Sequence, residues 1–355
     1  MRSGRPREPG IRSPPLTDEH PTIVTGAAGW LGTNLVRSLV ADGRRVRGLV
    51  LGGDDAAFLE LLGPQVEVVV GDVRDPDALD RLFEGAGDAD VFHTAAVIHP
   101  RRRTRELFDT NVGGTELVLD QARRVGVRRL VHVSSNSPFG VNPDPASAFT
   151  EDDPYRPWLA YGESKQEAEA LVVRAAERGD VHSVIVRAPW FYGPYQPARQ
   201  TRFLRAVRRG RFPVVGDGRQ RRSMVYVGNL VDGLRLAADA EVPPGRAYWV
   251  ADARPYELGE IIETVRAAFD AEGLACSGRP WRLPRAVSRA AEAADRLLQA
   301  GGRYHQALHV LGELGHTIAC DVSRARAELG YEPAVDLFEG MRRSIRWCLA
   351  RGEAL

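Results

Sequence analysis

The sequence predicts a doubly wound α/β domain, in which a parallel sheet lies between two layers of helices, followed by a smaller α/β cap. Three observations predict this fold class. Short apolar segments alternate with helical patterns from Pro21 to about Arg187, these segments are apolar throughout, and the first ends in a glycine-rich turn. Strands without polar alternation are buried on both faces, which is typical of a parallel sheet covered by helices.

The predicted elements follow one another as repeated strand–helix–strand units. Each strand candidate is a short run rich in β-branched residues and bounded by turn residues or charges. The first helix candidate, WLGTNLVRSLVADG, has apolar residues at helical spacing and is expected to end at Gly43. The strand candidates, in order, are TIVTG, RRVRGLV, VEVVVG, VFHTAAV, RRLVHVSS and HSVIVRAP.

Changes in composition divide the chain into three regions. Residues 1–20 are rich in proline, glycine and charge, so we expect a disordered tail. Residues 21–190 carry the sheet, and residues 226–250 are expected to return to it. Residues 191–355 mainly form the cap, with expected helices near residues 199–209, 228–240, 256–270, 284–300, 323–329 and 337–349.

The composition indicates a small-molecule partner. The 48 basic residues nearly balance the 47 acidic residues, so no net field favours nucleic acid or an anionic membrane. Cys276, Cys320 and Cys348 are scattered and odd in number, which predicts no disulfide framework, no metal site and a cytoplasmic location. No apolar run approaches the ~18 residues of a membrane span, and we expect no signal peptide.

The glycine turn TGAAGWLG predicts a dinucleotide site. Gly26, Gly29 and Gly32 follow the first strand and open the first helix. Glycines let the backbone approach a pyrophosphate closely, and the helix N-terminus offers unpaired amides and a positive dipole end. The alternative is a tight turn that binds nothing. The first interpretation makes residues 21–190 a dinucleotide-binding Rossmann domain.

A single lysine marks a candidate catalytic site. Lys165 is the only lysine of the chain, and it follows Tyr161 by four residues in the stretch YGESK. Four residues is about one helical turn, so both side chains share a helix face. An ammonium beside a phenol favours phenolate, and we therefore expect a lowered pKa for Tyr161 and a role as general acid and base. The alternative is a solvated lysine on a helix surface.

The spacing GxxGxxG, together with Tyr161-xxx-Lys165, resembles the short-chain dehydrogenase/reductase superfamily. Further motifs resemble its extended branch, which includes sugar-nucleotide epimerases and 3β-hydroxysteroid dehydrogenase-like enzymes. They are GDVRD with Asp72, HTAAV, NVGGT with Asn111, and RAPWFYGP with Arg187, Pro189, Tyr192 and Gly193. The resemblance extends from Thr22 to about Trp347 and implies a homodimer formed through a four-helix interface that includes the Tyr161 helix.

The resemblance also implies a nicotinamide cofactor. Asp72 corresponds to an acidic residue that contacts adenine, and Asn111 to an asparagine that supports the central helix. An acidic residue after the second strand would favour NAD and an arginine NADP; only Asp54 or Asp55 is near, which favours NAD slightly. The expected cofactor-binding residues are Gly26, Ala28, Gly29, Trp30, Leu31, Gly32, Asp54, Asp72, Val73, Thr94, Ala95, Ala96, Asn111, Ser134, Tyr161, Lys165, Pro189 and Phe191.

Ser135, Tyr161 and Lys165 correspond to the catalytic residues of the extended branch. Ser135 would orient the substrate oxygen, Tyr161 would move the proton, and Lys165 would hold the nicotinamide ribose. Dehydratases of this branch carry an acidic pair directly after the serine position, whereas this chain has Asn136 and Ser137. Dehydration is therefore not expected.

The expected substrate contacts are Ser135, Tyr192 and Arg222. Arg222 corresponds to the first of two arginines that clamp a sugar nucleotide, but the stretch HVLGELGHTIACD offers only His309 and His316 for the second. The cap therefore resembles 3β-hydroxysteroid dehydrogenase-like and β-keto acid reductase-like members, and Arg222 either contacts a substrate carboxylate or braces the cap. Aromatic residues around the site line either an apolar pocket or the core; they are Trp158, Trp190, Phe191 and Tyr192.

Three functional hypotheses follow. The first is an NAD(P)-dependent oxidoreductase that exchanges hydride with a secondary alcohol or ketone of a largely apolar small molecule. The second is a sugar-nucleotide 4-epimerase that acts through a transient ketosugar. The third is a non-catalytic dinucleotide sensor, which would need the glycine turn but no paired tyrosine and lysine.

Overall fold

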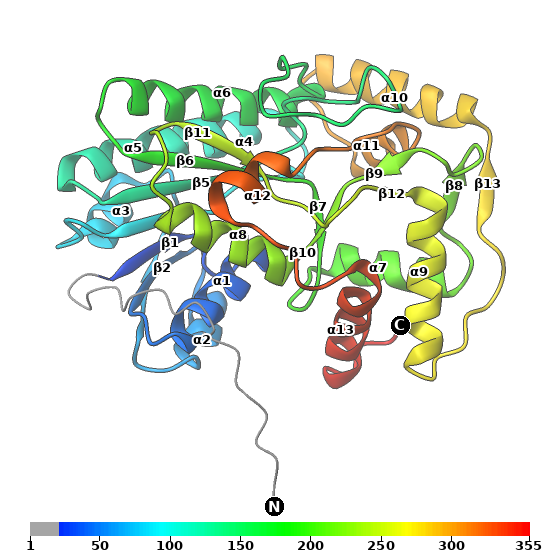
Figure 1. Ribbon diagram of the computed structural model, residues 1–355, viewed down its shortest axis with the longest axis horizontal. Coiled ribbons are helices and arrows are strands. Elements are labelled where there is room, and N and C mark those ends of the chain that lie inside the picture. Colours follow the sequence, from blue (N-terminus) through cyan, green and yellow to red (C-terminus); the bar gives the residue numbers. More distant parts are fainter. Residues whose placement is uncertain (1–20) are drawn as a thin grey trace, which may run out of the picture.

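A seven-stranded parallel sheet forms the centre of the molecule, in the order β11-β6-β5-β4-β1-β2-β3 (Figure 1). The computed structural model describes residues 21–355, apart from the side chains of residues 53–56; the tail expected over residues 1–20 lies outside this range. The doubly wound α/β class is confirmed. The strands are β1 (Thr22–Thr25), β2 (Val46–Val50), β3 (Val66–Val70), β4 (Asp90–His93), β5 (Arg129–Ser135), β6 (Ser183–Ala188) and β11 (Arg246–Trp249).

Helices cover both faces of this sheet, and each face has its own apolar core. Figure 1 shows α5 and α6 above the sheet and α1, α2 and α8 below it. The first layer comprises α3 (Pro76–Phe83), α4 (Arg105–Phe108), the π-helix η1 (Asp109–Gly113), α5 (Gly114–Val125) and α6 (Leu159–Glu177). The second comprises α1 (Trp30–Ala41), α2 (Gly53–Glu60) and α8 (Val227–Asp239).

The C-terminal half contributes both to the sheet and to a second, smaller body. β11 pairs with β6 at the edge of the sheet. The six helices expected after residue 190 are present, at most two residues from their expected starts: α7 (Ala198–Arg208), α8, α9 (Leu258–Ala271), α10 (Arg285–Ala300), α12 (Ser323–Leu329) and α13 (Leu337–Ala350). One further helix, α11 (Gln306–Glu313), was not expected.

Three short strand pairs connect these helices. They are β7 (Trp190–Tyr192) with β10 (Met224–Tyr226), β8 (Pro213–Val215) with β13 (Trp281–Leu283), and β9 (Arg221–Arg222) with β12 (Tyr256–Glu257). Within the described part of the chain, no helix combines the length and apolarity needed to cross a membrane.

A buried ion pair fixes α6 on the sheet. Arg187 in β6 pairs with Glu169 in α6 at 2.8 Å, and their side chains are only 5% and 0% exposed. The Tyr155 hydroxyl donates to the same carboxylate at 2.6 Å, and the guanidinium lies 4.5 Å from the centre of the Phe139 ring. Arg187 therefore belongs to the support of α6.

We predict that Glu169→Gln lowers the free energy of unfolding by about 3 kcal/mol, because the substitution leaves a buried guanidinium without its counter-charge. The control is Glu67→Gln, which removes the ion-pair partner of Arg47. The Glu67 side chain is 56% exposed, so this substitution should lower the free energy of unfolding by less than about 1 kcal/mol. Urea unfolding followed by circular dichroism measures both. Equal losses in the two variants would contradict the structural role of the buried pair.

Candidate active site

The turn after β1 has the geometry of a phosphate cradle. Gly26 has φ +66°, and a Cβ atom there would lie 2.8 Å from the Cα of Ala95. A Cβ on Gly32 would lie 2.1 Å from the carbonyl oxygen of Gly26, so only glycine permits this approach of α1 to the turn. Gly29 is the N-cap of α1, and no side chain caps its amides. The free amides and the bare backbone fit a pyrophosphate.

A second loop docks on the first turn of α1. The Trp30 indole donates to the carbonyl oxygen of Pro194 at 2.9 Å, and its ring lies 4.6 Å from that of Phe191. Ala28 is partly exposed, Leu31 is 6% exposed, and Pro189 is buried between β6 and β7. The structure thus brings β7 and the turn after it against the start of α1, where the resemblance places the nicotinamide end.

The segment after β4 passes directly over the glycine turn. The Thr94 hydroxyl donates to the Thr25 carbonyl oxygen at 2.7 Å, and the Ala95 amide donates to the Thr25 hydroxyl at 3.2 Å. Ala96 is exposed, next in the same loop. Asp54 lies in α2, and its side chain is outside the described residues.

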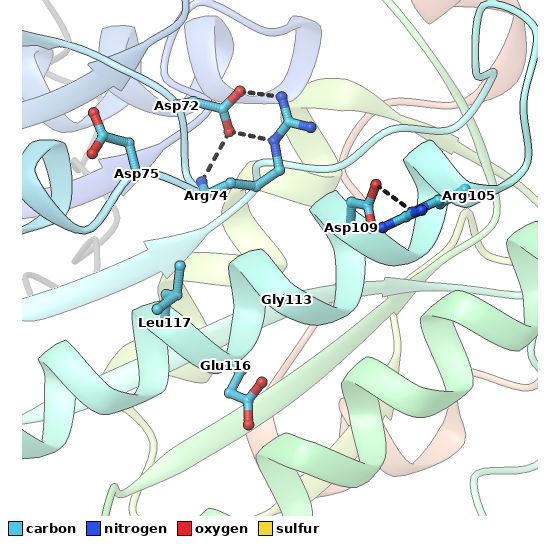
Figure 2. A pocket seen from close by; sticks show the side chains of 8 residues that line it. All are labelled: Asp72, Arg74, Asp75, Arg105, Asp109, Gly113, Glu116 and Leu117. Carbon is cyan, nitrogen blue, oxygen red and sulfur yellow. Dashed lines mark hydrogen bonds and ion pairs between the residues drawn. The ribbon is translucent and has the colours of Figure 1, made fainter.

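At the expected adenine end, Asp72 is already engaged by a residue that the sequence analysis missed. Its carboxylate accepts from the Arg74 amide and Nε, each at 2.9 Å, and pairs with Nη2 at 2.6 Å. Arg74 lowers the pKa of the Asp72 carboxyl. This pair lines an open cavity of about 680 Å³ together with Asp109 and Gly113, and Figure 2 shows how these residues lie relative to one another. Val73 is buried against Gly114.

Ser135 and Tyr161 meet where β5 ends and α6 begins. Ser135 is the last residue of β5, and Tyr161 lies in the first turn of α6. The Ser135 hydroxyl lies close enough to the Tyr161 phenol to act on its pKa, so the two hydroxyls are neighbours. The Ser135 oxygen also accepts from the Ser137 amide at 3.3 Å. Ser134 Oγ is buried and has no hydrogen-bond partner within the described part of the chain.

This approach depends on Gly162, which the sequence analysis did not single out. A Cβ atom on Gly162 would lie 2.5 Å from the carbonyl oxygen of Ser137. The Trp158 amide donates to the same oxygen at 2.8 Å, so the start of α6 lies directly on the turn after β5. The signal in the sequence that could have identified this close contact is a glycine inside the first turn of an expected helix.

The expected pKa of Tyr161 was wrong in direction. Burial raises it to about 12, although the Ser135 hydrogen bond and the positive charge of Arg199 oppose the rise. Lys165 does not compensate, because its ammonium donates to the Val133 carbonyl oxygen at 2.8 Å and is itself buried. Burial lowers the pKa of Lys165 to about 8. At neutral pH the phenol is therefore protonated.

Asn111 ties the loop after β4 to α6. Its side-chain oxygen accepts from the Val97 amide at 2.8 Å, and its nitrogen donates to the Val97 carbonyl oxygen at 2.9 Å and to the Ser164 hydroxyl at 3.0 Å. Asn111 lies in the π-helix η1, an irregularity that is frequent at functional sites. Ser164 stands between Tyr161 and Lys165 in the sequence, so this contact also holds the part of α6 that carries both residues.

Two expected substrate contacts are corrected by the structure. Tyr192 is 0% exposed, and its hydroxyl donates to the buried carboxylate of Asp252 at 2.8 Å, so it is a core residue. Arg222 pairs with Glu313 of α11 at 2.8 Å, and its side chain is only 8% exposed. The bracing alternative for Arg222 therefore agrees with the structure, whereas a free guanidinium for a substrate anion does not.

The histidines in the second clamp position are also paired. His309 binds Asp295 of α10 at 2.9 Å, and His316 binds Glu292 of α10 at 2.9 Å. Gln299, also from α10, accepts from the Ala160 amide beside Tyr161 at 3.2 Å. The hairpin of α10 and α11 thus covers the start of α6.

Other groups in this region were missed because they come from distant parts of the chain. Arg199 of α7 acts electrostatically on both Tyr161 and Tyr304. The Tyr304 hydroxyl lies 2.5 Å from His99 Nδ1. Within the described side chains, no group of three or more His, Cys, Asp or Glu residues could hold a metal ion.

Comparisons with known proteins agree with this geometry. Residues 22–251 match the model of the NAD dependent epimerase/dehydratase family. The chain is 32% identical over 327 residues to the 4-hydroxy-2-methyl-3-oxo-4-farnesyl-3,4-dihydroquinoline-1-oxide ketoreductase of Stigmatella aurantiaca, covering 90% of this chain and 94% of that protein. It is 31% identical over 363 residues to a 3 beta-hydroxysteroid dehydrogenase/Delta 5-->4-isomerase of Mycobacterium tuberculosis, with coverage of 91% and 93%.

A solved structure shows the same architecture. DesIV, a dTDP-glucose 4,6-dehydratase from Streptomyces venezuelae with NAD and TYD bound, superposes with a TM-score of 0.72 at 25% identity, covering 93% of this chain and 98% of that chain. The family match spans the sheet, the glycine turn and the Ser135–Tyr161 pair. The chain therefore belongs to the NAD dependent epimerase/dehydratase family, whose members are enzymes of the extended short-chain dehydrogenase/reductase type.

Proposed function

We propose that the protein is an NAD(P)-dependent oxidoreductase that exchanges a hydride between the nicotinamide and a secondary alcohol or ketone of a largely apolar small molecule. One observation carries this proposal: Ser135 and Tyr161 meet at the carboxyl end of β5, beyond a glycine turn that can hold a pyrophosphate. Ligands of open α/β sheets bind at this end of the strands. The names of the ketoreductase and steroid dehydrogenase relatives support an apolar carbonyl substrate.

The residues fit a dinucleotide along the carboxyl edge of the sheet. The turn at Gly26 and Gly29 would hold the pyrophosphate, Asp72 and Arg74 would lie at the adenine end, and Lys165 would hold the nicotinamide ribose. We favour NAD slightly, on the position of Asp54 in the sequence. When bound and reduced, the nicotinamide supplies the hydride.

The protonated phenol suits the reductive direction. Because burial keeps Tyr161 protonated at neutral pH, it can donate its proton to a carbonyl oxygen as negative charge develops there. The Ser135 hydroxyl would donate a second hydrogen bond to the same oxygen and so stabilise the charge. Oxidation of an alcohol would use the same two groups in reverse, with Tyr161 accepting the proton.

The paired side chains of the cap argue against a sugar-nucleotide epimerase. A diphosphate needs cationic groups, yet Arg222 is neutralised by Glu313, and His309 and His316 are each bound to a carboxylate. A non-catalytic sensor is also disfavoured, because Gly162 and Asn111 hold Tyr161 against Ser135 in an arrangement that binding alone does not require.

A substrate panel tests the proposal. Purified protein is given NAD(H) or NADP(H) with 3β-hydroxysteroids, 2-alkyl-3-oxoalkanoates and UDP-glucose. We expect a net change in the absorbance of the reduced nicotinamide with a steroid or an oxo acid. Epimerised sugar without net absorbance change would support the epimerase instead, and cofactor binding without turnover of any class would support the sensor.

We predict that Tyr161→Phe lowers turnover by about 10²- to 10⁴-fold, the usual contribution of a positioned general acid. Affinity for the reduced cofactor, measured by fluorescence titration, should remain within about threefold, because a phenylalanine keeps the shape of the ring. The control Tyr331→Phe also removes a buried phenolic hydroxyl, which donates to the Ala251 carbonyl oxygen away from the site, and should keep turnover. Near-wild-type turnover in Tyr161→Phe would contradict the acid role.

We predict that Gly162→Ala reduces turnover by about 10²-fold, because the added methyl group forces the start of α6 away from Ser137 and misplaces Tyr161 by a fraction of an ångström or more. Gly259→Ala is the matched control: it lies in the first turn of α9, and its added Cβ would meet no atom closer than 3.6 Å. Steady-state kinetics of both variants measure the difference. Equal activity would show that α6 tolerates the displacement.

A further inference from the structure

The only lysine of the chain is buried without a counter-ion. Lys165 is 2% exposed, and of the carboxylates that the structure describes, none pairs with it within 4.0 Å. Glu169, one turn further along α6, is committed to Arg187. The ammonium has two neighbours instead: the Val133 carbonyl oxygen at 2.8 Å, and the Nε2 atom of His132 at 3.4 Å.

The protonation state of His132 follows from this contact. An ammonium has only donors, so Nε2 of His132 must be the acceptor, and the proton of the neutral ring must sit on Nδ1. His132 is 0% exposed, and Nδ1 has no hydrogen-bond partner among the described residues. Burial, the nearby Lys165 charge and His93 all hold the pKa of His132 well below its ordinary value. The ring therefore stays neutral and keeps an unpaired donor.

A second imidazole, that of His93, lies beside the His132 ring on the neighbouring strand. His93 in β4 and His132 in β5 are register partners, with ring centres 5.3 Å apart. Both nitrogens of His93 bind hydroxyls, Nδ1 that of Thr25 at 2.8 Å and Nε2 that of Thr115 at 2.9 Å. Burial and the Lys165 charge lower the pKa of His93 to about 3, so it is neutral too. The titratable groups facing Lys165 are thus two neutral imidazoles from the sheet and Glu169 from its own helix.

We propose that His132 is a positioning residue for Lys165: its neutral imidazole accepts a hydrogen bond from the ammonium and, with the Val133 carbonyl oxygen, fixes Nζ at the carboxyl end of β5. The burial of an unpaired Nδ1–H is costly, and an apolar ring of similar size would avoid that cost. The contact with Lys165 supplies the physical reason for a histidine at this place.

The contact also links the two ionisation states of Lys165. When the ammonium loses a proton, the neutral amine gains a lone pair and can accept a hydrogen bond from an Nε2–H of His132. Such a bond requires the imidazole proton on Nε2 instead of Nδ1. The neutral amine also keeps two N–H donors, so His132 is a partner of Lys165 in both states: an acceptor for the ammonium, and either a donor or an acceptor for the amine.

Because the chain has one lysine, its ionisation can be read directly. The full-length protein without cofactor is labelled with lysine carrying ¹⁵Nζ and ¹³Cε, which gives one lysine signal to follow against pH by NMR. We expect a wild-type pKa of about 8. In His132→Phe the ammonium loses an acceptor, so its pKa should fall by about 1, the size expected for one hydrogen bond to a charged group.

Two further variants separate positioning from packing. His132→Gln places an amide oxygen near the former Nε2 position and should return the pKa of Lys165 toward the wild-type value. His182→Phe replaces a histidine that binds the Val242 carbonyl oxygen elsewhere and should leave the titration unchanged. A folded His132→Phe protein with the wild-type titration would overturn the proposal, as would a His132→Gln variant that titrates like His132→Phe.

The wild-type protein provides a test that needs no substitution. The ¹⁵N shifts of the His132 ring distinguish the two tautomers, and we expect Nδ1–H below the pKa of Lys165 and a shift of both nitrogens as Lys165 titrates. A ring that carries its proton on Nε2 at pH 6 would overturn the proposal. The catalytic importance of this contact rests on the proposed function, but the contact itself does not. Neither NMR measurement requires turnover, so a negative result in the substrate panel would not decide this test.

Discussion

The start of α6 lies directly on the turn that follows β5, and the rest of the site depends on this contact. Gly162 makes it possible, because any larger residue would meet the Ser137 carbonyl oxygen. The contact brings Tyr161 to Ser135 and directs Lys165 toward the end of the sheet. Two anchors keep α6 in place: Asn111 through Ser164, and Arg187 through Glu169.

Burial controls the electrostatics of this helix face more strongly than the pairing of charges does. The phenol and the ammonium both lose solvent, so the pKa of Tyr161 rises and that of Lys165 falls, each toward the neutral form. The result is a phenol that stays protonated at neutral pH, one helical turn before an ammonium whose charge is only moderately favoured. The neutral histidines near Lys165 fit the same pattern, because a second positive charge beside this ammonium would have no counter-ion.

Much of the fold could be predicted from the sequence, because its signals are local. The six strand candidates and the glycine turn are short runs with clear boundaries, and all six occur in the sheet. The family followed from motifs in the same segments. Helix α11 escaped prediction because it has only eight residues and is held mainly by α10, whose Ser288 hydroxyl donates to the carbonyl oxygens of Leu311 and Gly312.

The partners of site residues were less predictable, because they come from distant parts of the chain. Helical spacing places Tyr161 and Lys165 on one face but does not say that Lys165 reaches past the phenol to Val133. Nor can the sequence show that Arg222 meets Glu313, 91 positions later, or that Tyr192 turns into the core. The homodimer, the cytoplasmic location and the division into domains stay predictions.

The protonation state of Tyr161 tests the account most directly. Labelling the nine tyrosines with ¹³C at Cζ and comparing wild type with Tyr161→Phe identifies the signal of this phenol, which can then be followed against pH in the protein without cofactor. Burial predicts that the signal stays that of a neutral phenol beyond the ordinary tyrosine pKa of about 10, with a midpoint of about 12. A midpoint near neutral pH would show that the charge of Lys165 dominates and would contradict the account.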